Sequence, residues 1–239
     1  MKSSTLKTKG FKFKQFSIEG GQSGMPVSTD GVMLGAWAFE QTPTNILDIG
    51  TGTGLLALMC AQRFPNCKIE AIDIDEHAYA AATANIDVSP WKDRVTVQRL
   101  DVLESKFNHC FEGVICNPPY FNSGEHAQHS QRATARHTHT LNHESLVKVI
   151  GEILTSDGKA SFVLPVIEGE KFIEIAKRNG LFLSRLCSVK PTATKPANRV
   201  LFELQKQNVD CQKTDLIVRD EMGYTEAFVA LTRSFYLKM

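Results

Sequence analysis

The stretch from Asn45 to Arg63 limits the possible fold more than any other part of this chain. Residues 45–49 are Asn-Ile-Leu-Asp-Ile, which is typical of a buried strand, and they lead directly into a Gly-Thr-Gly-Thr-Gly loop at residues 50–54. A run rich in Leu, Ala and Met follows and predicts a helix from Leu55 to about Arg63. Glycine lets a ligand approach the backbone closely, and a helix start exposes free N–H groups. The stretch therefore predicts a nucleotide-binding loop.

Two further predicted strands lead into acidic residues. The strand at 68–72 runs into Asp73, about 20 residues past the glycine loop, where such folds place an acid that binds ribose hydroxyls. The strand at 94–100 is followed by Asp101, and the first strand contains Asp48. In open α/β sheets, ligands bind at the carboxyl ends of the strands. The three acids therefore predict a ligand site at one edge of a sheet.

Strands and helices alternate along the rest of the chain, which predicts an α/β fold with a doubly wound, largely parallel sheet. We expect further strands at 113–116, 159–166, 181–189 and 200–204, short structure at 216–218, a turn at 156–158, and helices at 29–40, 76–87, 143–154, 168–179 and 225–236. Alternating Phe and Lys at residues 11–14 predict a strand before a turn at 19–21. The simplest organisation is a basic tail and hairpin extension at 1–27 and one domain at 28–239.

Composition excludes several classes of protein. Hydrophobic residues make up 42% of the chain and charged residues 22%, as in soluble globular proteins with a sizeable core. A net charge of +1 excludes a globally basic nucleic-acid binder, although a local basic face remains possible. The six cysteines form no CxxC pair, so reduced thiols in the cytoplasm are expected. We expect no secretory signal and no membrane span, because no apolar run approaches ~18 residues.

The tetrapeptide Asn117-Pro118-Pro119-Tyr120 directly follows the predicted strand at 113–116. Proline fixes φ and biases the residue before it away from the helical region, so the two prolines predict a stiff turn. The turn would hold one amide and one phenol ring at the end of the strand. An Asn oxygen accepts hydrogen bonds from an amino group, and an aromatic ring stacks on a planar base. The tetrapeptide therefore suits a flat ligand with an exocyclic NH2, with an ordinary turn as the alternative.

The spacing of the glycines distinguishes two classes of cofactor. A dinucleotide-binding loop has the pattern G-x-G-x-x-G, whereas the glycines here stand at 50, 52 and 54. The loop resembles the Asp-x-Gly-x-Gly-x-Gly loop of class I S-adenosylmethionine-dependent methyltransferases. That resemblance implies a Rossmann-like, mostly parallel sheet of seven strands, with S-adenosylmethionine as cofactor, S-adenosylhomocysteine as product and no metal. The cofactor-binding residues that it implies are Thr29, Asp30, Asp48, Gly50, Thr51, Gly52, Gly54, Asp73, Ile74, Asp101, Val102 and Asn117. For Thr29 and Asp30, helix capping is an open alternative.

Within that superfamily, Asn-Pro-Pro-Tyr after the fourth strand is similar to the motif of enzymes that methylate an amino group. The resemblance implies direct transfer, with Asn117, Pro118 and Tyr120 as the catalytic residues. The side-chain oxygen of Asn117 and the carbonyl oxygen of Pro118 would accept hydrogen bonds from the target NH2, and Tyr120 would stack on its ring. These bonds favour the partly positive nitrogen of the transition state. A base inside a folded RNA must also be flipped out of its stack.

Four segments, at residues 11–16, 28–37, 117–121 and 235–239, narrow the choice of substrate. Together they resemble the bacterial tRNA(Val)-specific adenine-N(6)-methyltransferase family, over nearly the whole chain. The resemblance implies tRNA as the partner, the adenine beside the anticodon as the target, and no obligatory protein partner. The expected substrate-binding residues are Pro119, Tyr120, Phe121, Lys12, Lys14, Arg132, Arg136, Lys195 and Arg199. The basic members, with Lys190, would form a positive rim at the sheet edge, unless each belongs to an ordinary solvated face.

Other functions stay open at this point. A guanine-amino rRNA methyltransferase or a protein glutamine methyltransferase would share the tetrapeptide, and a non-catalytic RNA-binding module could keep the fold. The phenylalanines at 11, 13 and 16 could stack on bases or could face the core. Histidines at 126, 129, 137 and 139 have no Cys or carboxylate partner at a spacing typical of a metal site, so we expect no metal.

Overall fold

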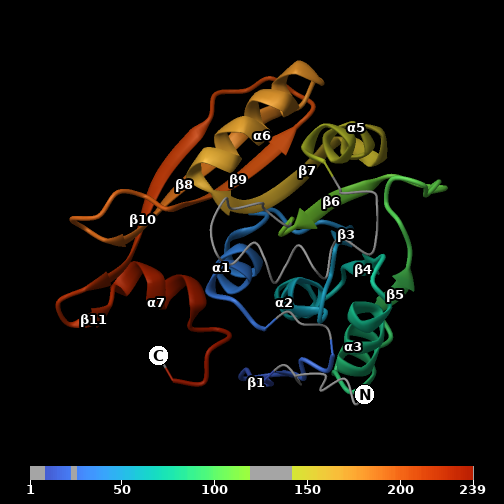
Figure 1. Ribbon diagram of the computed structural model, residues 1–239, viewed down its shortest axis with the longest axis horizontal. Helices are drawn as coiled ribbons and strands as arrows, with labels where there is room; N and C mark the ends of the chain where they lie inside the picture. The colour runs from blue at the N-terminus through green and yellow to red at the C-terminus, as the bar shows by residue number, and fades with distance from the viewer. Residues whose placement is uncertain (1–8, 23–25, 119–141, 239) are drawn as a thin grey trace, which may run out of the picture.

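The structure, a computed structural model, describes residues 9–22, 26–118 and 142–238. Most of its strands form one large sheet (Figure 1). These strands are β3 (Asn45–Ile49), β4 (Lys68–Asp73), β5 (Val95–Arg99), β6 (Phe111–Cys116), β7 (Leu154–Pro165), β8 (Phe182–Thr192), β9 (Arg199–Gln205), β10 (Gln212–Asp220) and β11 (Gly223–Tyr224). Their order across the sheet is β11-β10-β8-β9-β7-β6-β3-β4-β5.

Strand direction decides where the ends of the strands meet. Strands β3 to β7 run parallel, β8 and β10 are parallel to each other, and β9 is antiparallel to both of its neighbours, β7 and β8. The carboxyl ends of all these parallel strands therefore lie at one edge of the sheet, called here the carboxyl edge. The first residue of β9, Arg199, lies there too, because it pairs with Pro165 at the end of β7.

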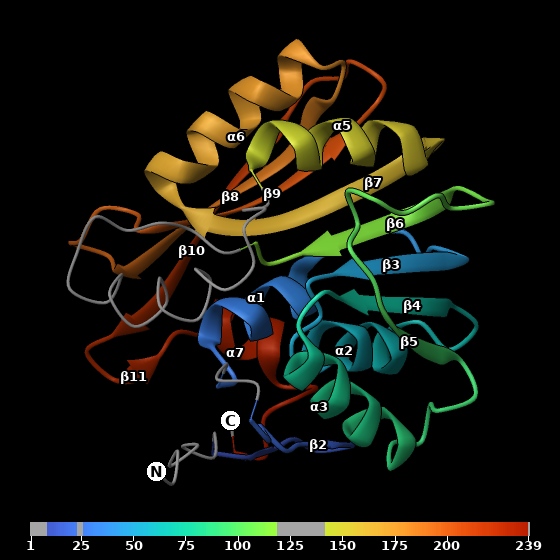
Figure 2. The same ribbon diagram turned by 45° about the vertical axis from the view of Figure 1, so that its right-hand side comes forward.

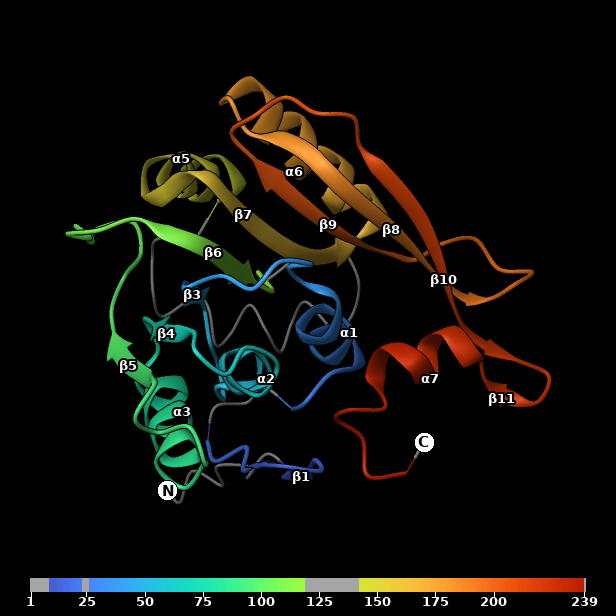
Figure 3. The ribbon, with the colours of Figure 1, turned by 180° about the vertical axis from the view of Figure 1, so that it is seen from behind.

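Helices cover both faces of the sheet. They are α1 (Thr29–Trp37), α2 (Leu55–Arg63), α3 (Glu76–Asp87), α5 (His143–Ile153), α6 (Val166–Arg178) and α7 (Glu226–Thr232). Figures 2 and 3 show α5 and α6 on one face and α1, α2 and α3 on the other, with α7 beside α1. Each face has its own hydrophobic core. Within the described ranges, no helix is both long and apolar enough to cross a membrane.

Aromatic packing holds α6 on the sheet. Phe172 of α6 is fully buried, and its ring centroid lies 4.8 Å from that of Phe162 on β7 and 5.7 Å from that of Phe202 on β9. Burial of one such side chain contributes roughly 1.5–3 kcal/mol. Because α6 begins directly after β7, this packing also sets the position of its first turn at the carboxyl edge.

The predicted doubly wound, mostly parallel sheet is confirmed, although the number of strands is larger than seven. The expected strands form the part of the sheet from β8 to β5, and β10 and β11 extend it beyond β8. The turn expected at 156–158 is wrong. Leu154 pairs with Phe111 and Lys159 with Gly113, so the residues between them form a bulge within β7.

Two predicted helix ends also differ. Helix α1 ends at Trp37 rather than near residue 40, because the Arg63 guanidinium donates hydrogen bonds to carbonyl oxygens at its end, including that of Ala38, and Phe39 adopts a φ of 54°. The final helix ends at Thr232 rather than at residue 236. The residues after it form a turn, and Tyr236 then pairs with Phe13.

A two-stranded hairpin precedes the large sheet, as expected from the alternating Phe and Lys. Its strands are β1 (Phe11–Lys12) and β2 (Ser17–Ile18). Phe13 and Phe16 are buried in the core, and Phe13 pairs with Tyr236 of the C-terminal segment. Base stacking by these two phenylalanines is therefore excluded, because their rings have no free face toward solvent.

Candidate active site

The carboxyl edge brings the predicted residues of four strands together. Ile49 of β3 lies opposite Cys116 of β6, so the next residues, Gly50 and Asn117, leave adjacent strands side by side. On the other side of β3, Asp73 ends β4, and Asp101 follows β5 at the same edge. The sequence predicted these groups at the ends of strands. Because the strands run parallel, their carboxyl ends meet at one edge and the groups lie close together.

The glycine loop has a backbone that few other residues could adopt. Gly50, Gly52 and Gly54 have φ values of 69°, 60° and 82°. A Cβ added to Gly50 or Gly52 would meet no atom within 4 Å, so open space lies beside both residues. Gly54 instead packs against α3, where an added Cβ would lie 3.5 Å from the Cα of Ala82. The loop thus presents bare backbone on its open side, as a closely bound ligand requires.

The buried side chain of Asp48 holds this loop in place through hydrogen bonds. Its carboxylate is fully buried, and Oδ2 accepts hydrogen bonds from Thr51 Oγ1 at 2.6 Å and from the Ala57 amide at 3.0 Å. No described residue donates a hydrogen bond to Oδ1. Burial raises the pKa of Asp48 to about 7. The loop and the first turn of α2 are therefore joined through one carboxylate.

Replacing Asp48 with asparagine tests this burial. In the folded protein the pKa is raised, so the proton is held more tightly than in the unfolded chain. Stability relative to Asp48→Asn should therefore fall as the pH rises from about 4 to about 7, by on the order of 4 kcal/mol, and then stay constant. Urea unfolding of both proteins across this range measures the difference. A difference that does not change with pH would show that Asp48 is ionised throughout.

Asp73 connects the end of β4 to the glycine loop. Its Oδ2 accepts a hydrogen bond from the Gly52 amide at 2.9 Å, and its Oδ1 accepts one from the Asp75 amide at 3.0 Å. Burial raises the pKa of this carboxyl group. The neighbouring Ile74 side chain is 43% exposed. A carboxylate beside an open apolar side chain suits the sugar and the flat ring of a nucleoside.

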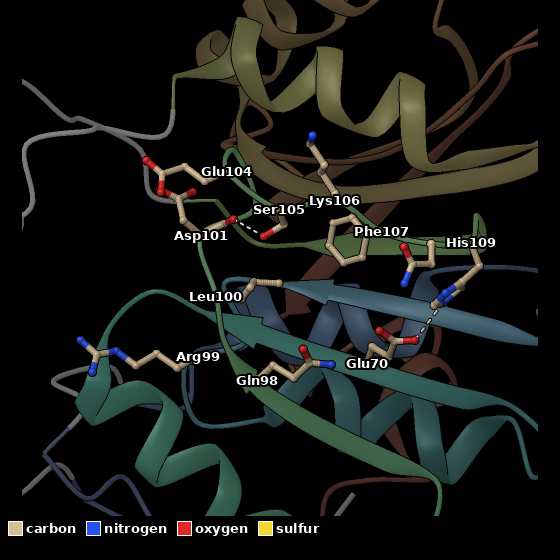
Figure 4. A pocket seen from close by; sticks show the side chains of 11 residues that line it. Glu70, Gln98, Arg99, Leu100, Asp101, Glu104, Ser105, Lys106, Phe107 and His109 are labelled. Atoms are coloured by element: carbon tan, nitrogen blue, oxygen red, sulfur yellow. Dashed lines mark hydrogen bonds and ion pairs between the residues drawn. The ribbon is translucent and has the colours of Figure 1, made fainter.

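Asp101 and Val102 complete this side of the site. Asp101 Oδ1 accepts a hydrogen bond from the Leu103 amide at 2.9 Å, and Val102 is buried. Asp101 lines a cavity of about 600 Å³. Figure 4 shows it at one end of the cavity with Glu104, and the His109–Glu70 pair at the other end. Among the predicted residues that the structure describes, only Asp101 lines this cavity. The glycine loop lies outside it.

Asn117 and Pro118 are the described part of the tetrapeptide. Asn117 is partly exposed and Pro118 is buried, at the end of a strand flanked by β3 and β7. A buried proline after Asn117 restricts the backbone that carries the amide. The other predicted substrate residues of this region, Pro119, Tyr120, Phe121, Arg132 and Arg136, lie outside the described residues, as do the histidines from 126 to 139.

Thr29 and Asp30 do not cap α1. Ser28 is the N-cap and accepts a hydrogen bond from the Gly31 amide at 3.1 Å. Asp30 Oδ2 instead accepts a hydrogen bond from Arg199 Nε at 2.7 Å, and Thr29 is exposed. The structure thus pairs a predicted cofactor residue with a predicted RNA residue.

Those of the expected basic groups that lie in the described ranges do not form one continuous rim. Lys190 pairs with Asp215 at 3.1 Å, and Arg199 pairs with Asp30, so both charges are partly neutralised. Lys195 is exposed in the connection between β8 and β9. Lys12 and Lys14 are exposed on the hairpin, which all three ribbon views place beneath α2 and α3, far from that connection. Nor do the described residues contain a group of three or more His, Cys, Asp or Glu side chains suited to a metal.

One residue next to the site was missed. Asn85 of α3 is 2% exposed, and its amide contacts the glycine loop. It shares the buried face of α3 with Ala78, Ala81 and Ala82. The sequence signal that could have found it is a polar amide at helical spacing on the alanine-rich face of the predicted helix.

Comparison with known proteins agrees with this geometry. Residues 32–164 match the family model described as the methyltransferase small domain. Over all 239 residues, the chain is 60% identical to a protein of Vibrio parahaemolyticus named tRNA1(Val) (adenine(37)-N6)-methyltransferase, and the match covers 100% of both chains.

Solved structures share the fold at low identity. A predicted O-methyltransferase from Agrobacterium tumefaciens superposes with a TM-score of 0.65 at 18% identity, covering 85% of this chain and 95% of the other. The glycopeptide N-methyltransferase MtfA, solved in complex with S-adenosylmethionine, superposes with a TM-score of 0.56 at 13% identity, covering 76% and 89%.

Proposed function

Since the chain belongs to the tRNA1(Val) (adenine(37)-N6)-methyltransferase family, we infer that it transfers a methyl group from S-adenosylmethionine to the exocyclic amino group of an adenine in tRNA. The structural observation that supports this reaction is the exit of Gly50 and Asn117 from adjacent strands. A cofactor lying on the glycine loop would thereby meet an amino group held by Asn117. The target is the adenine beside the anticodon, at position 37.

The residues of the carboxyl edge fit S-adenosylmethionine. The open backbone beside Gly50 and Gly52 leaves room for its chain, and the Asp73 carboxylate suits its ribose hydroxyls. Ile74 would contact the adenine ring, and Asp101 would accept a hydrogen bond from its amino group. When bound, the sulfonium supplies an electrophilic methyl group. The product would be S-adenosylhomocysteine, and the reaction needs no metal.

The protein contributes alignment of the acceptor nitrogen. We place the side-chain oxygen of Asn117 and the carbonyl oxygen of Pro118 within reach of the two amino hydrogens, so that the nitrogen lone pair faces the methyl group. The nitrogen–carbon bond forms as the carbon–sulfur bond breaks, and the two acceptors stabilise the positive charge that develops on nitrogen. The methylated nitrogen then loses its proton to water. Tyr120 would hold the flipped base by stacking.

The tRNA would approach the carboxyl edge. Exposed Lys195 next to the end of β8, with Arg132 and Arg136, would contact phosphates, and Lys12 and Lys14 would add a second patch on the hairpin. Arg199 would contact a phosphate only by giving up its hydrogen bond with Asp30.

We propose that residues 1–27 form an extension of the methyltransferase domain at 28–239, and that the enzyme acts in the cytoplasm.

A labelling experiment tests this function. The purified protein is incubated with radiolabelled S-adenosylmethionine and total tRNA from cells that lack the corresponding enzyme, and the tRNA is digested to nucleosides. We expect label in N6-methyladenosine alone. Label in guanosine would instead indicate a guanine-amino methyltransferase, label only in added protein would indicate a glutamine methyltransferase, and no label would indicate a binding module.

A further inference from the structure

Asn85 makes three hydrogen bonds to backbone groups of two separate segments. Its Nδ2 donates to the Thr53 carbonyl oxygen at 2.9 Å and to the Glu19 carbonyl oxygen at 3.0 Å, and its Oδ1 accepts from the Glu19 amide at 2.8 Å. The side chain is 2% exposed. Both N–H donors of the amide and one acceptor position of its oxygen are therefore engaged in hydrogen bonds to backbone groups.

The two segments have different origins. Thr53 belongs to the glycine loop, between Gly52 and Gly54. Glu19 belongs to residues 19–22, which follow the hairpin strand β2 and pass along α3, and which we call the strap. Gly21 of the strap has a φ of 54°, and a Cβ added to it would lie 3.5 Å from the Ala81 side chain. The strap is thus in close contact with the same helix that supports the glycine loop.

We propose that Asn85 is a positioning residue that couples the strap to the glycine loop, so that cofactor binding and docking of the strap support each other. This inference rests on the proposed function, in which the loop holds S-adenosylmethionine. Asn85 itself would touch neither the cofactor nor the tRNA. It acts through the backbone of Thr53 and Glu19.

The physical basis is the cost of ordering the two segments. A loop with three left-handed glycines has many alternative conformations, and binding a ligand to it costs conformational entropy. The Asn85 amide restricts the loop at the Thr53 carbonyl before the ligand arrives. Because the same amide also holds Glu19, order in one segment lowers the cost of order in the other. By linkage, the effect is reciprocal.

The coupling is tested with Asn85→Ala and a matched control, Asn45→Ala. Asn45 also bonds two backbone groups: its Nδ2 donates to the Cys110 carbonyl oxygen, and its Oδ1 accepts from the Glu112 amide. Asn45 is the first residue of β3, so these bonds lie at the edge of the sheet opposite the carboxyl edge. Both variants should lose thermal stability, because each removes hydrogen bonds between the side chain and backbone groups of another segment. Only Asn85→Ala should weaken binding of S-adenosylmethionine, by about tenfold in the Kd measured by calorimetry, and raise its KM more than it lowers kcat.

Hydrogen exchange on the wild-type protein gives a second readout that needs no variant. Saturating S-adenosylmethionine should slow exchange of the Glu19 amide as well as of the glycine-loop amides. Unchanged exchange at Glu19, or an Asn85→Ala Kd within twofold of that of Asn45→Ala, would overturn the coupling while leaving the proposed function intact. A wild-type protein that does not bind S-adenosylmethionine would overturn both.

Discussion

Asn117→Ala is expected to lower kcat by about a thousandfold and to leave the Kd for S-adenosylmethionine within about threefold. Asn117 lies at the end of β6, beside the glycine loop rather than within it. Its amide oxygen would accept a hydrogen bond from an amino group that becomes positive only as the methyl group is transferred. Loss of that acceptor therefore affects the transition state much more than the bound cofactor. Single-turnover rates with tRNA and calorimetry with S-adenosylmethionine separate the two quantities.

A conservative variant sharpens this prediction. Asn117→Asp keeps the shape of the side chain and an oxygen that accepts hydrogen bonds, so it should keep more activity than Asn117→Ala. Circular dichroism should show that both variants fold, because the residue is only partly buried. An alanine variant with wild-type turnover would exclude Asn117 as the acceptor and would move the reaction centre elsewhere on the carboxyl edge.

Asp73→Ala should have the largest effect on the cofactor, raising the Kd for S-adenosylmethionine by about a hundredfold. A carboxylate that accepts hydrogen bonds contributes roughly 1.5–3 kcal/mol per bond, and a hundredfold change corresponds to about 2.7 kcal/mol. The variant also removes the bond between Oδ2 and the Gly52 amide, which holds the loop toward β4. Calorimetric titration of the folded variant measures the affinity.

Asp75→Ala is the matched control, because it removes a carboxylate only two residues away. Asp75 caps α3 and accepts hydrogen bonds from the His77 and Ala78 amides at 2.9 Å each. Its loss should cost about 1 kcal/mol of stability and change the cofactor affinity by less than threefold. Equal losses of affinity in both variants would mean that the first turn of α3, rather than Asp73 itself, determines binding.

The central part of the fold could be predicted because its signals are local. The apolar strand before residues 50–54 and the helix after them are encoded within 19 residues, from Asn45 to Arg63. Given parallel strands, the acids at the strand ends had to meet at one edge. Asp73, Asp101 and Asn117 could therefore be placed together without any knowledge of distances.

The parts that were missed depend on contacts between distant segments. The pairing of Asp30 with Arg199 joins residues 169 positions apart, and the local sequence around either residue does not predict it. The bulge in β7 follows from its register against β6, because a Ser-Asp-Gly sequence alone favours a turn. Phe13 is buried against Tyr236 of the C-terminal segment, and Phe16 packs on Phe13 and Trp91, which the alternation of residues 11–14 could not reveal.

The most direct test of the account uses two transcripts of tRNA1(Val) that differ only at position 37. With radiolabelled S-adenosylmethionine, the transcript with adenine at this position should gain about one methyl group per molecule, recovered as N6-methyladenosine. The transcript with guanine at position 37 should gain none. Equal labelling of the two transcripts, or label recovered in guanosine, would contradict the assignment of this enzyme to the adenine beside the anticodon.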